Sequence, residues 1–294
     1  MSSNSPYAVG IDIGGTNTKA SVISQDGKVL DSRHLPTQQE REPLVAVVKQ
    51  LLTDLKTDGL PVGISSPGMA NRDNRSIRWM RGRMHCVEGL VWGDALGRPV
   101  AVLNDAHAAT YGEAWRGAAV GKQHVVLLTL GTGVGGGVIT SGHLLQGTIG
   151  RAGHLGHVCV DLHGKPDLAK TPGSIEDFIG NHNVGERTGG RFNSTADLVA
   201  AVRKGDEAAT RVWQTSIRAL ACAIVSFINS FDPEIVVIGG GIALSGDALF
   251  KPLAKELDEI EWRPLDVGVP IVPATLGDVA GAIGVAHYAA TRKP

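Results

Sequence analysis

Apolar and polar positions alternate in a way that predicts strands and helices in turn. The first part of the chain is expected to form three strands separated by glycine turns: residues 7–13, 19–24 and 28–35. Apolar residues then recur at spacings of three and four between residues 44 and 55, which predicts an amphipathic helix closed by Gly59. A strand over residues 99–103 is expected to lead directly into another helix.

The second part of the chain repeats the opening order. A strand, a glycine-rich turn, a strand, a Ser-Gly turn and a further strand follow one another between residues 124 and 147. Aligning Gly14 with Gly131 places Val22 on Ile139. The repeat predicts two lobes built on one plan. A chance similarity of two glycine-rich hairpins is the alternative.

The last third carries a long apolar helix and one more strand. Residues 213–231 place their apolar side chains on one helical face, and Asp232-Pro233 is expected to end that helix. Residues 234–241 read as a buried strand that enters a triple-glycine turn, and a helix follows. With no low-complexity linker between them, the two lobes are expected to pack closely in an α/β fold.

Composition narrows the class of protein. Hydrophobic residues make up 43% of the 294 positions and charged residues 19%, which is typical of a folded globular chain. The formal net charge of −1 offers no electrostatic attraction for nucleic acid or an anionic membrane. Three dispersed cysteines argue against a disulfide framework, and no signal-peptide pattern or uninterrupted apolar run of membrane-spanning length is apparent. We therefore expect a soluble cytoplasmic protein.

Three glycine-rich turns each follow an apolar strand: DIGGTNTK, LGTGVGGG and IGGGIALSG. Ligands bind at the carboxyl ends of strands in open α/β sheets, and glycine lets backbone amides approach phosphate oxygens. Any one turn could be an ordinary hairpin turn. Together, with polar residues interleaved, they favour phosphate binding. The spacing matches neither a dinucleotide fingerprint nor a Walker-type loop.

Asn104-Asp105 stands where a strand is expected to end and a helix to begin. One interpretation is a helix cap, because Asn and Asp are favoured there. The other is catalytic. A carboxylate at this edge could accept the proton of an alcohol that receives a phosphoryl group, and the asparagine could bind a sugar hydroxyl group.

Segments spanning nearly the whole chain resemble the ROK family of repressors, open reading frames and sugar kinases. They are VGIDIGGTNTKASVI, LNDAHAA, LLTLGTGVGGGVI, GRAGHLGH, IVVIGGGI and LGDVAGAIGVAHYA. The resemblance implies a two-lobed actin-like ATPase (ribonuclease H-like) fold with duplicated mixed sheets flanked by helices. It implies one lobe from residues 1–105 and 280–294, another from residues 106–279, and a cleft between them that binds ATP and Mg²⁺.

The same resemblance implies the roles of individual residues. Asp12 is expected near Mg²⁺ and the phosphates, with Asp105 as the catalytic base. The remaining cofactor-binding positions are Gly14, Gly15, Thr16, Asn17, Lys19, Thr132 and Gly133 at the phosphates, and Gly239, Gly240 and Gly241 by the adenosine. The expected sugar-binding positions are Gly68, Asn104, His154, His157 and Glu176. For Gly68, a plain turn is an equal alternative.

Histidines crowd residues 150–167, which could suggest a metal site. Many members of the family bind structural zinc through a Gly-His histidine and three cysteines. Here the histidine is His157, but the three cysteine positions carry Asp167, Ala169 and Ser174. We therefore expect no structural zinc.

The same loop departs from the family at His154, where the sugar kinases carry a glutamate. A neutral imidazole nitrogen accepts one hydrogen bond, whereas a carboxylate accepts from two hydroxyl groups. A changed sugar or sugar orientation is one consequence; a loop histidine without a role is the alternative. His163 is expected on the surface.

The sequence thus predicts an ATP-dependent sugar kinase that phosphorylates a hydroxyl group, the 6-hydroxyl, of a hexose such as glucose. The alternative is a degenerate family member that binds or senses a sugar without phosphorylating it. A repressor is disfavoured because only eleven residues precede Asp12. The resemblance also implies a homodimer, whereas the near-neutral net charge argues against a nucleic-acid or membrane partner.

Overall fold

The structure, a computed structural model, describes residues 5–82 and 84–292 and divides into two compact units. The first unit comprises Met1–Gly121, Leu144–Gly153 and Thr275–Pro294, and the second comprises Lys122–His143 and His154–Ala274. The first unit therefore takes in residues 106–121, 144–153 and 275–279, which the sequence division had assigned to the second lobe.

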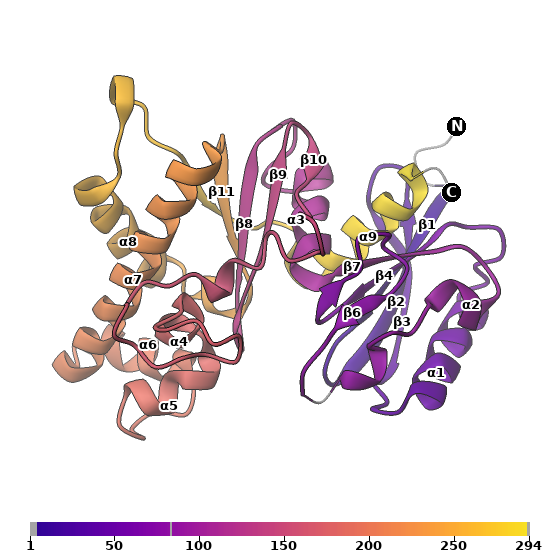
Figure 1. The fold of residues 1–294 in the computed structure, drawn as a ribbon, viewed down its shortest axis with the longest axis horizontal. Coiled ribbons are helices and arrows are strands. Elements are labelled where there is room, and N and C mark those ends of the chain that lie inside the picture. Colours follow the sequence, from indigo (N-terminus) through magenta and orange to yellow (C-terminus); the bar gives the residue numbers. More distant parts are fainter. Residues whose placement is uncertain (1–4, 83, 293–294) are drawn as a thin grey trace. The chain divides into compact units, whose positions relative to one another are not determined.

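A five-stranded sheet in the order β3-β2-β1-β4-β7 forms the centre of the first unit (Figure 1). Strands β1, β2 and β3 are antiparallel, whereas β4 and β7 run parallel to β1. The elements are β1 (Pro6–Ile13), β2 (Asn17–Ser24), β3 (Val29–Pro36), α1 (Arg41–Asp54), β4 (Val62–Ser66), β5 (Met69–Ala70), β6 (Ile77–Trp79), α2 (Trp92–Leu96), β7 (Val100–Asn104), α3 (Asp105–Arg116) and α9 (Ala280–Thr291).

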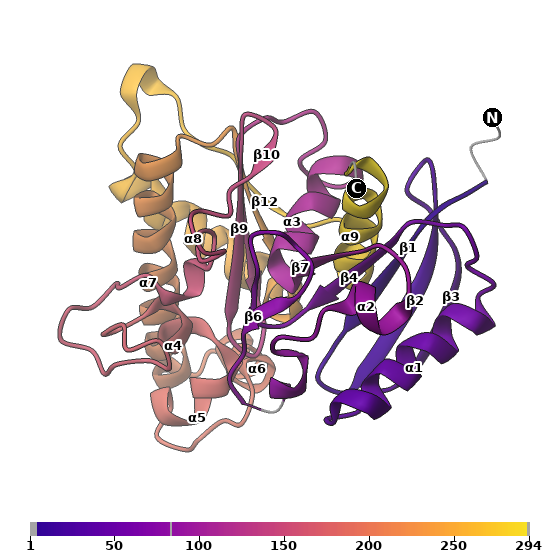
Figure 2. The same cartoon turned by 45° about the vertical axis from the view of Figure 1, so that its right-hand side comes forward.

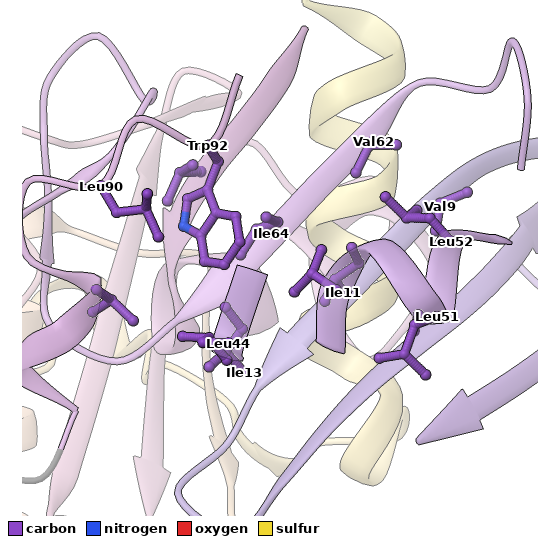
Figure 3. Packing of buried hydrophobic residues seen from close by; sticks show 14 of the residues in the cluster. Val9, Ile11, Ile13, Leu44, Leu51, Leu52, Val62, Ile64, Leu90 and Trp92 are labelled. Carbon is purple, nitrogen blue, oxygen red and sulfur yellow. The ribbon is translucent and has the colours of Figure 1, made fainter. Parts of the chain in front are cut away.

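Helices cover this sheet on both faces. The alternating residues Val9, Ile11 and Ile13 of β1 join the buried cluster that includes α1 and Trp92 (Figure 3). Gly10, between Val9 and Ile11, faces the other side of the sheet, where α9 packs. A Cβ at Gly10 would lie 1.9 Å from the Ala282 carbonyl oxygen, so glycine is needed for α9 to pack this close. Because side chains alternate between the two faces of β1, one face of the sheet carries the apolar core and the other packs closely against α9.

The second unit has its own five-stranded sheet, in the order β10-β9-β8-β11-β12. Helices pack around it, with the long α7 in contact with α4, α6 and α8 (Figure 2). The elements are β8 (Val125–Leu130), β9 (Val134–Thr140), β10 (His143–Leu144), α4 (Ile175–Ile179), α5 (Val184–Arg187), α6 (Thr195–Arg203), α7 (Glu207–Phe231), β11 (Ile235–Gly239), α8 (Asp247–Ile260) and β12 (Ile271–Pro273).

The two sheets share one plan, as the repeat predicted. In each sheet an antiparallel hairpin, β1-β2 or β8-β9, is followed by two strands that pair in parallel, and a further strand borders the hairpin. The alignment beyond the turn needs a correction, however. Val9 pairs with Val22, and the matching Val126 pairs with Val138 rather than Ile139. The second glycine turn is one residue shorter than the first, which shifts every later equivalence by one.

Helix α1 ends earlier than its sequence suggested. It closes at Asp54, and Lys56, with a φ of 51°, takes a left-handed conformation before the expected closing residue, Gly59, whose φ is 75°. The Thr57 amide and hydroxyl both donate to the carbonyl of Leu52, at 3.2 and 3.0 Å. These hydrogen bonds satisfy the end of the helix and make an unfavourable lysine conformation tolerable.

Helix α7 is confirmed as the long apolar helix, with the expected stop at Asp232, which has a φ of 44°. Its length and composition would allow it to cross a bilayer, although arginines interrupt its apolar run. Since 56% of its most apolar window is buried within the protein, the same features fit a core helix.

Candidate active site

Polar residues gather at the carboxyl edge of the first sheet. In the pairing of β1 with β4, Asp12 lies opposite Ser65, and in the pairing of β4 with β7, Ser66 lies opposite Asn104. Asp105 follows immediately as the first residue of α3. Parallel pairing thus brings Asp12 beside Ser65, 53 positions away in the chain, and Ser66 beside Asn104.

Asp12 is held by its neighbour across the sheet. The Ser65 hydroxyl donates to Asp12 Oδ1 at 2.7 Å. Burial raises the pKa of Asp12, and this effect exceeds the opposing effects of the Ser65 hydrogen bond and the Lys19 charge. Lys19 Nζ also lies 3.4 Å from Asp278 Oδ2, with which it forms an ion pair. The Ser65 hydrogen bond therefore orients the Asp12 carboxylate through Oδ1 and does not involve Oδ2.

Asn104 caps helix α3, so the capping interpretation is confirmed. Its side-chain oxygen accepts hydrogen bonds from the amides of Ala106 and His107, at 3.0 and 3.2 Å. Its Nδ2 donates to the Gly68 carbonyl at 2.9 Å. Because an amide nitrogen carries two protons, one N–H group remains for a second acceptor. A sugar contact by Asn104 is compatible with its capping role and stays a prediction.

Asp105 combines a perturbed acidity with access to water. Its pKa is raised to about 6, first by loss of hydration among the surrounding protein atoms and further by the Asp12 charge. The Ala106 amide, which donates to Asp105 Oδ1 at 2.8 Å, opposes this shift. The residue itself is exposed, so water reaches the carboxylate and screens part of this effect.

Gly68 is a turn residue whose conformation demands glycine. Its φ is +98°, and a Cβ would lie 2.8 Å from both Ile77 Cγ2 and the Trp79 carbonyl oxygen. Its carbonyl orients Asn104, as described above. The structure therefore supports the plain-turn alternative, and a direct sugar contact by Gly68 stays a prediction.

The first glycine turn, Gly14 to Asn17, is pinned from outside by Thr37. The Thr37 hydroxyl donates to the Gly14 carbonyl at 2.8 Å, and the Thr37 amide donates to the Thr16 carbonyl at 2.9 Å. Within the turn, the Gly14 amide donates to the Asn17 carbonyl at 3.0 Å. The carbonyl oxygens of Gly14, Thr16 and Asn17 are thus engaged by the protein, which favours an anion site lined by amides.

The second glycine turn, Gly131 to Gly133, repeats this design. The Asn181 amide donates to the Gly131 carbonyl at 2.9 Å, and the His182 amide donates to the Thr132 carbonyl at 2.8 Å. Glu176 approaches from α4, where its Oε2 accepts from the Val134 amide at 2.9 Å. A Cβ at Gly133 would lie 2.2 Å from that oxygen, so Glu176 and Gly133 depend on each other.

Three turn glycines have no steric requirement in the fold. A Cβ at Gly15, Gly131 or Gly241 would meet no atom of residues 5–82 or 84–292 within 4 Å, and none of the three has a positive φ. Gly240 differs, because its φ is +85° and a Cβ would lie 2.3 Å from the Leu130 carbonyl oxygen. Close approach of a ligand to the backbone is a reason for glycine at the first three positions that protein packing does not supply.

His157 and Asp167 form a pair within the second unit. His157 Nδ1 lies 2.8 Å from Asp167 Oδ2, and the Asp167 side chain is only 1% exposed whereas that of His157 is 34% exposed. Burial raises the pKa of Asp167, but the hydrogen bonds from His157 and the Thr171 amide reverse this, and the net shift is downward. His154, partly buried, precedes the 3₁₀ turn Leu155–His157, and His163 is exposed as expected.

A zinc ion does not fit the residues at the family's ligand positions. Asp167 Oδ2 is bonded to His157, and Asp167 Oδ1 accepts from the amides of Ala169 and Thr171, at 2.8 and 2.9 Å. The Ala169 side chain has no ligand atom, which leaves Ser174 as a poor fourth group. Among the described residues, no group of three or more His, Cys, Asp and Glu side chains is arranged to hold a metal ion.

Sequence reasoning missed the residues that hold the site residues in place. Thr37 fixes the first glycine turn, Ser65 fixes Asp12 and Asp167 fixes His157. Each acts on a residue that is ten or more positions away. The only available signal was Asp167, a carboxylate at a position where the family has a cysteine, and it was interpreted as a lost ligand rather than as a new partner.

Comparisons with known proteins agree with this geometry. A profile of the ROK family matches residues 8–292. Glucokinase from Thermotoga maritima is 35% identical over 95% of both chains, and N-acetylmannosamine kinase from Escherichia fergusonii is 31% identical over 96% of this chain and 98% of its own. A ROK family glucokinase from Streptomyces griseus, solved in complex with glucose and AMPPNP, superposes with a TM-score of 0.79 at 26% identity, covering 96% of this chain and 98% of its own. The duplicated sheets, the glycine turns and these matches together identify the chain as a member of the ROK family with the actin-like ATPase fold of its sugar kinases.

Proposed function

We propose that this protein is a sugar kinase that transfers the γ-phosphoryl group of ATP to the 6-hydroxyl of a hexose. The observation that carries the proposal is the placement of Asp105: a carboxylate of raised pKa, open to solvent, beside Asp12 at the carboxyl edge of the sheet. The similarity to glucokinases and an N-acetylmannosamine kinase supports the same class of reaction.

Asp105 would accept the proton of the attacking hydroxyl group as its oxygen forms a bond to the γ-phosphorus and the bond to ADP breaks. A carboxylate with a pKa raised towards 6 is a stronger base than an ordinary aspartate and is still ionised at neutral pH. The Asn104 amide would orient the hydroxyl, and the amides of the glycine turns would stabilise phosphate charge.

Asp12 suits the Mg²⁺ ion that this chemistry requires. Mg²⁺ prefers carboxylate oxygens and retained waters, and the bond from Ser65 orients the Asp12 carboxylate while occupying only Oδ1. When bound, the ion would neutralise charge on the ATP phosphates. The first glycine turn follows Asp12 by two residues, so one strand end supplies both groups.

The direct test is ADP release by the purified protein across a panel of hexoses that includes glucose, mannose and N-acetylmannosamine. Turnover of at least one sugar, with the product phosphorylated at the 6-position by NMR, is the expected result. ATP binding without turnover of any sugar would contradict the proposal and favour a sugar-sensing protein.

The raised pKa of Asp105 predicts an acid limb in the pH profile. The base must be unprotonated, so kcat/KM should fall about tenfold per pH unit once the pH drops below about 6. Initial rates between about pH 4.5 and 8, with thermal stability checked at each pH, measure this. A limb centred near the ordinary aspartate value of about 4 would contradict the upward shift.

Gly15→Ala is expected to separate ATP binding from folding. A methyl group at Gly15 meets no atom within 4 Å in the part of the chain that the structure describes, so the melting temperature should stay within about 2 °C. The KM for ATP should rise about tenfold, because the methyl group blocks the approach of a phosphate. Gly185→Ala, which has similar free space but lies in α5, should change neither value. An unchanged KM for ATP in Gly15→Ala would remove the first turn from the phosphate site.

A further inference from the structure

The loop that carries His157 is organised by a buried aspartate where a metal ion could have been expected. Asp167 bonds to His157 through Oδ2 and to the amides of Ala169 and Thr171 through Oδ1. The Gly173 amide donates to the Lys165 carbonyl at 2.9 Å and closes the loop further. The Asp167 side chain thus connects His157 to the backbone of residues 169–171.

The bonds of Asp167 determine the state of His157. An ionised carboxylate accepts hydrogen bonds and donates none, so the contact of 2.8 Å requires the proton of His157 on Nδ1. In a neutral imidazole the other nitrogen, Nε2, then carries a lone pair. Since Asp167 is buried and His157 is one-third exposed, Nδ1 is the nitrogen turned towards the protein.

We propose that Asp167 is a positioning residue that replaces the family's zinc: it holds His157 in the Nδ1-protonated form, with Nε2 as an acceptor for a sugar hydroxyl group. This inference rests on the proposed function for the identity of the ligand. It goes beyond that function by assigning the direction of one sugar hydrogen bond and the residue that enforces it. His157 would bind the substrate, and Asp167 would act only through His157.

Asp167→Asn tests the inference because the shape of the side chain is kept while one oxygen becomes a donor. An amide rotated to keep its oxygen on the Ala169 and Thr171 amides turns its NH₂ group towards His157. His157 must then accept at Nδ1 and carry its proton on Nε2. The KM for the sugar should rise at least tenfold, while the KM for ATP and kcat should change by less than threefold.

Asp161→Asn is the matched control. Asp161 lies in the same loop, but its side chain accepts from the exposed His163 amide at 3.0 Å and is not bonded to His157. It should leave all kinetic constants unchanged. Asp167→Glu, which keeps the carboxylate, should recover part of the sugar affinity that Asp167→Asn loses.

A readout independent of activity is the ¹⁵N spectrum of the imidazole groups at pH 8, with His157 assigned by its loss in His157→Gln. The wild-type protein should show a protonated Nδ1 and an unprotonated Nε2, and Asp167→Asn should show the reverse. The wild-type protein, expressed with added zinc, should retain less than 0.1 equivalents of the metal after purification. An Nε2-protonated wild type, stoichiometric zinc, or an unchanged sugar KM in a folded Asp167→Asn variant would each overturn the inference.

The two proposals fail separately. If no sugar is phosphorylated, the proposed function is wrong, but the spectrum and the metal content still decide the role of Asp167. If Asp167→Asn does not fold, the spectrum of the wild-type protein decides alone. If sugars are phosphorylated but the Asp167→Asn spectrum matches the wild type, only the inference about Asp167 is wrong.

Discussion

Asp105→Asn is expected to lower kcat for sugar phosphorylation by about 10³-fold while the dissociation constant for the sugar changes by less than about threefold. The asparagine keeps the size of the side chain and can still accept the Ala106 amide, which lies 2.8 Å from Asp105 Oδ1. It cannot take up the proton of the attacking hydroxyl group. Coupled ADP-release kinetics give kcat, and calorimetric titration gives the sugar affinity.

The matched control is Asp94→Asn, which removes an exposed carboxylate from α2 of the same unit and should leave kcat unchanged. The stability of helix α3 is a second check, since its cap is Asn104 rather than Asp105. The melting temperature of Asp105→Asn should therefore stay close to that of the wild type. Turnover within about tenfold of the wild type would exclude Asp105 as the base.

Hydrophobic periodicity predicted most of the fold. The period-two pattern of β1 and the spacing of three and four in α1 and α7 depend on local sequence, and all three elements form, although α1 ends earlier than expected and α7 begins at Glu207, before the expected residue 213. The errors lie where tertiary contacts decide. Lys56 ends α1 because Thr57 bonds back to Leu52, and no local signal favours a left-handed lysine. The unequal length of the two glycine turns is also invisible without strand register.

The sequence predicted the residues of the candidate site better than it predicted the residues that orient them. Asn104-Asp105 and the glycine turns could be found because strand ends and glycines leave a sequence signature. The residues that orient them could not, because parallel pairing of strands brings Ser65 to Asp12 across 53 positions. The alignment with a zinc motif correctly located Asp167, but only the distance of 2.8 Å to His157 shows that it is a partner.

Glu113 is a further residue that the sequence did not single out. It is fully buried in α3, and its two oxygens accept from four donors. Oε1 accepts from the amides of Thr275 and Leu276, at 3.0 and 2.8 Å, and Oε2 from the Ala118 amide at 2.6 Å and the Thr275 hydroxyl at 3.2 Å. The carboxylate thus joins α3 to the segment where the chain re-enters the first unit at Thr275.

Glu113→Ala is expected to destabilise the protein by about 3–5 kcal/mol, because it removes a fully buried carboxylate that accepts from four donors. The apparent melting temperature should fall by on the order of 10 °C in a thermal scan. Glu113→Gln keeps one acceptor oxygen but places an NH₂ group against donors, so it should cost about 2 kcal/mol. Glu259→Ala, an exposed position on α8, should change stability by less than about 0.5 kcal/mol. A Glu113→Ala protein as stable as this control would mean that water or local rearrangement satisfies the four donors, and that α3 is joined to Thr275 by packing alone.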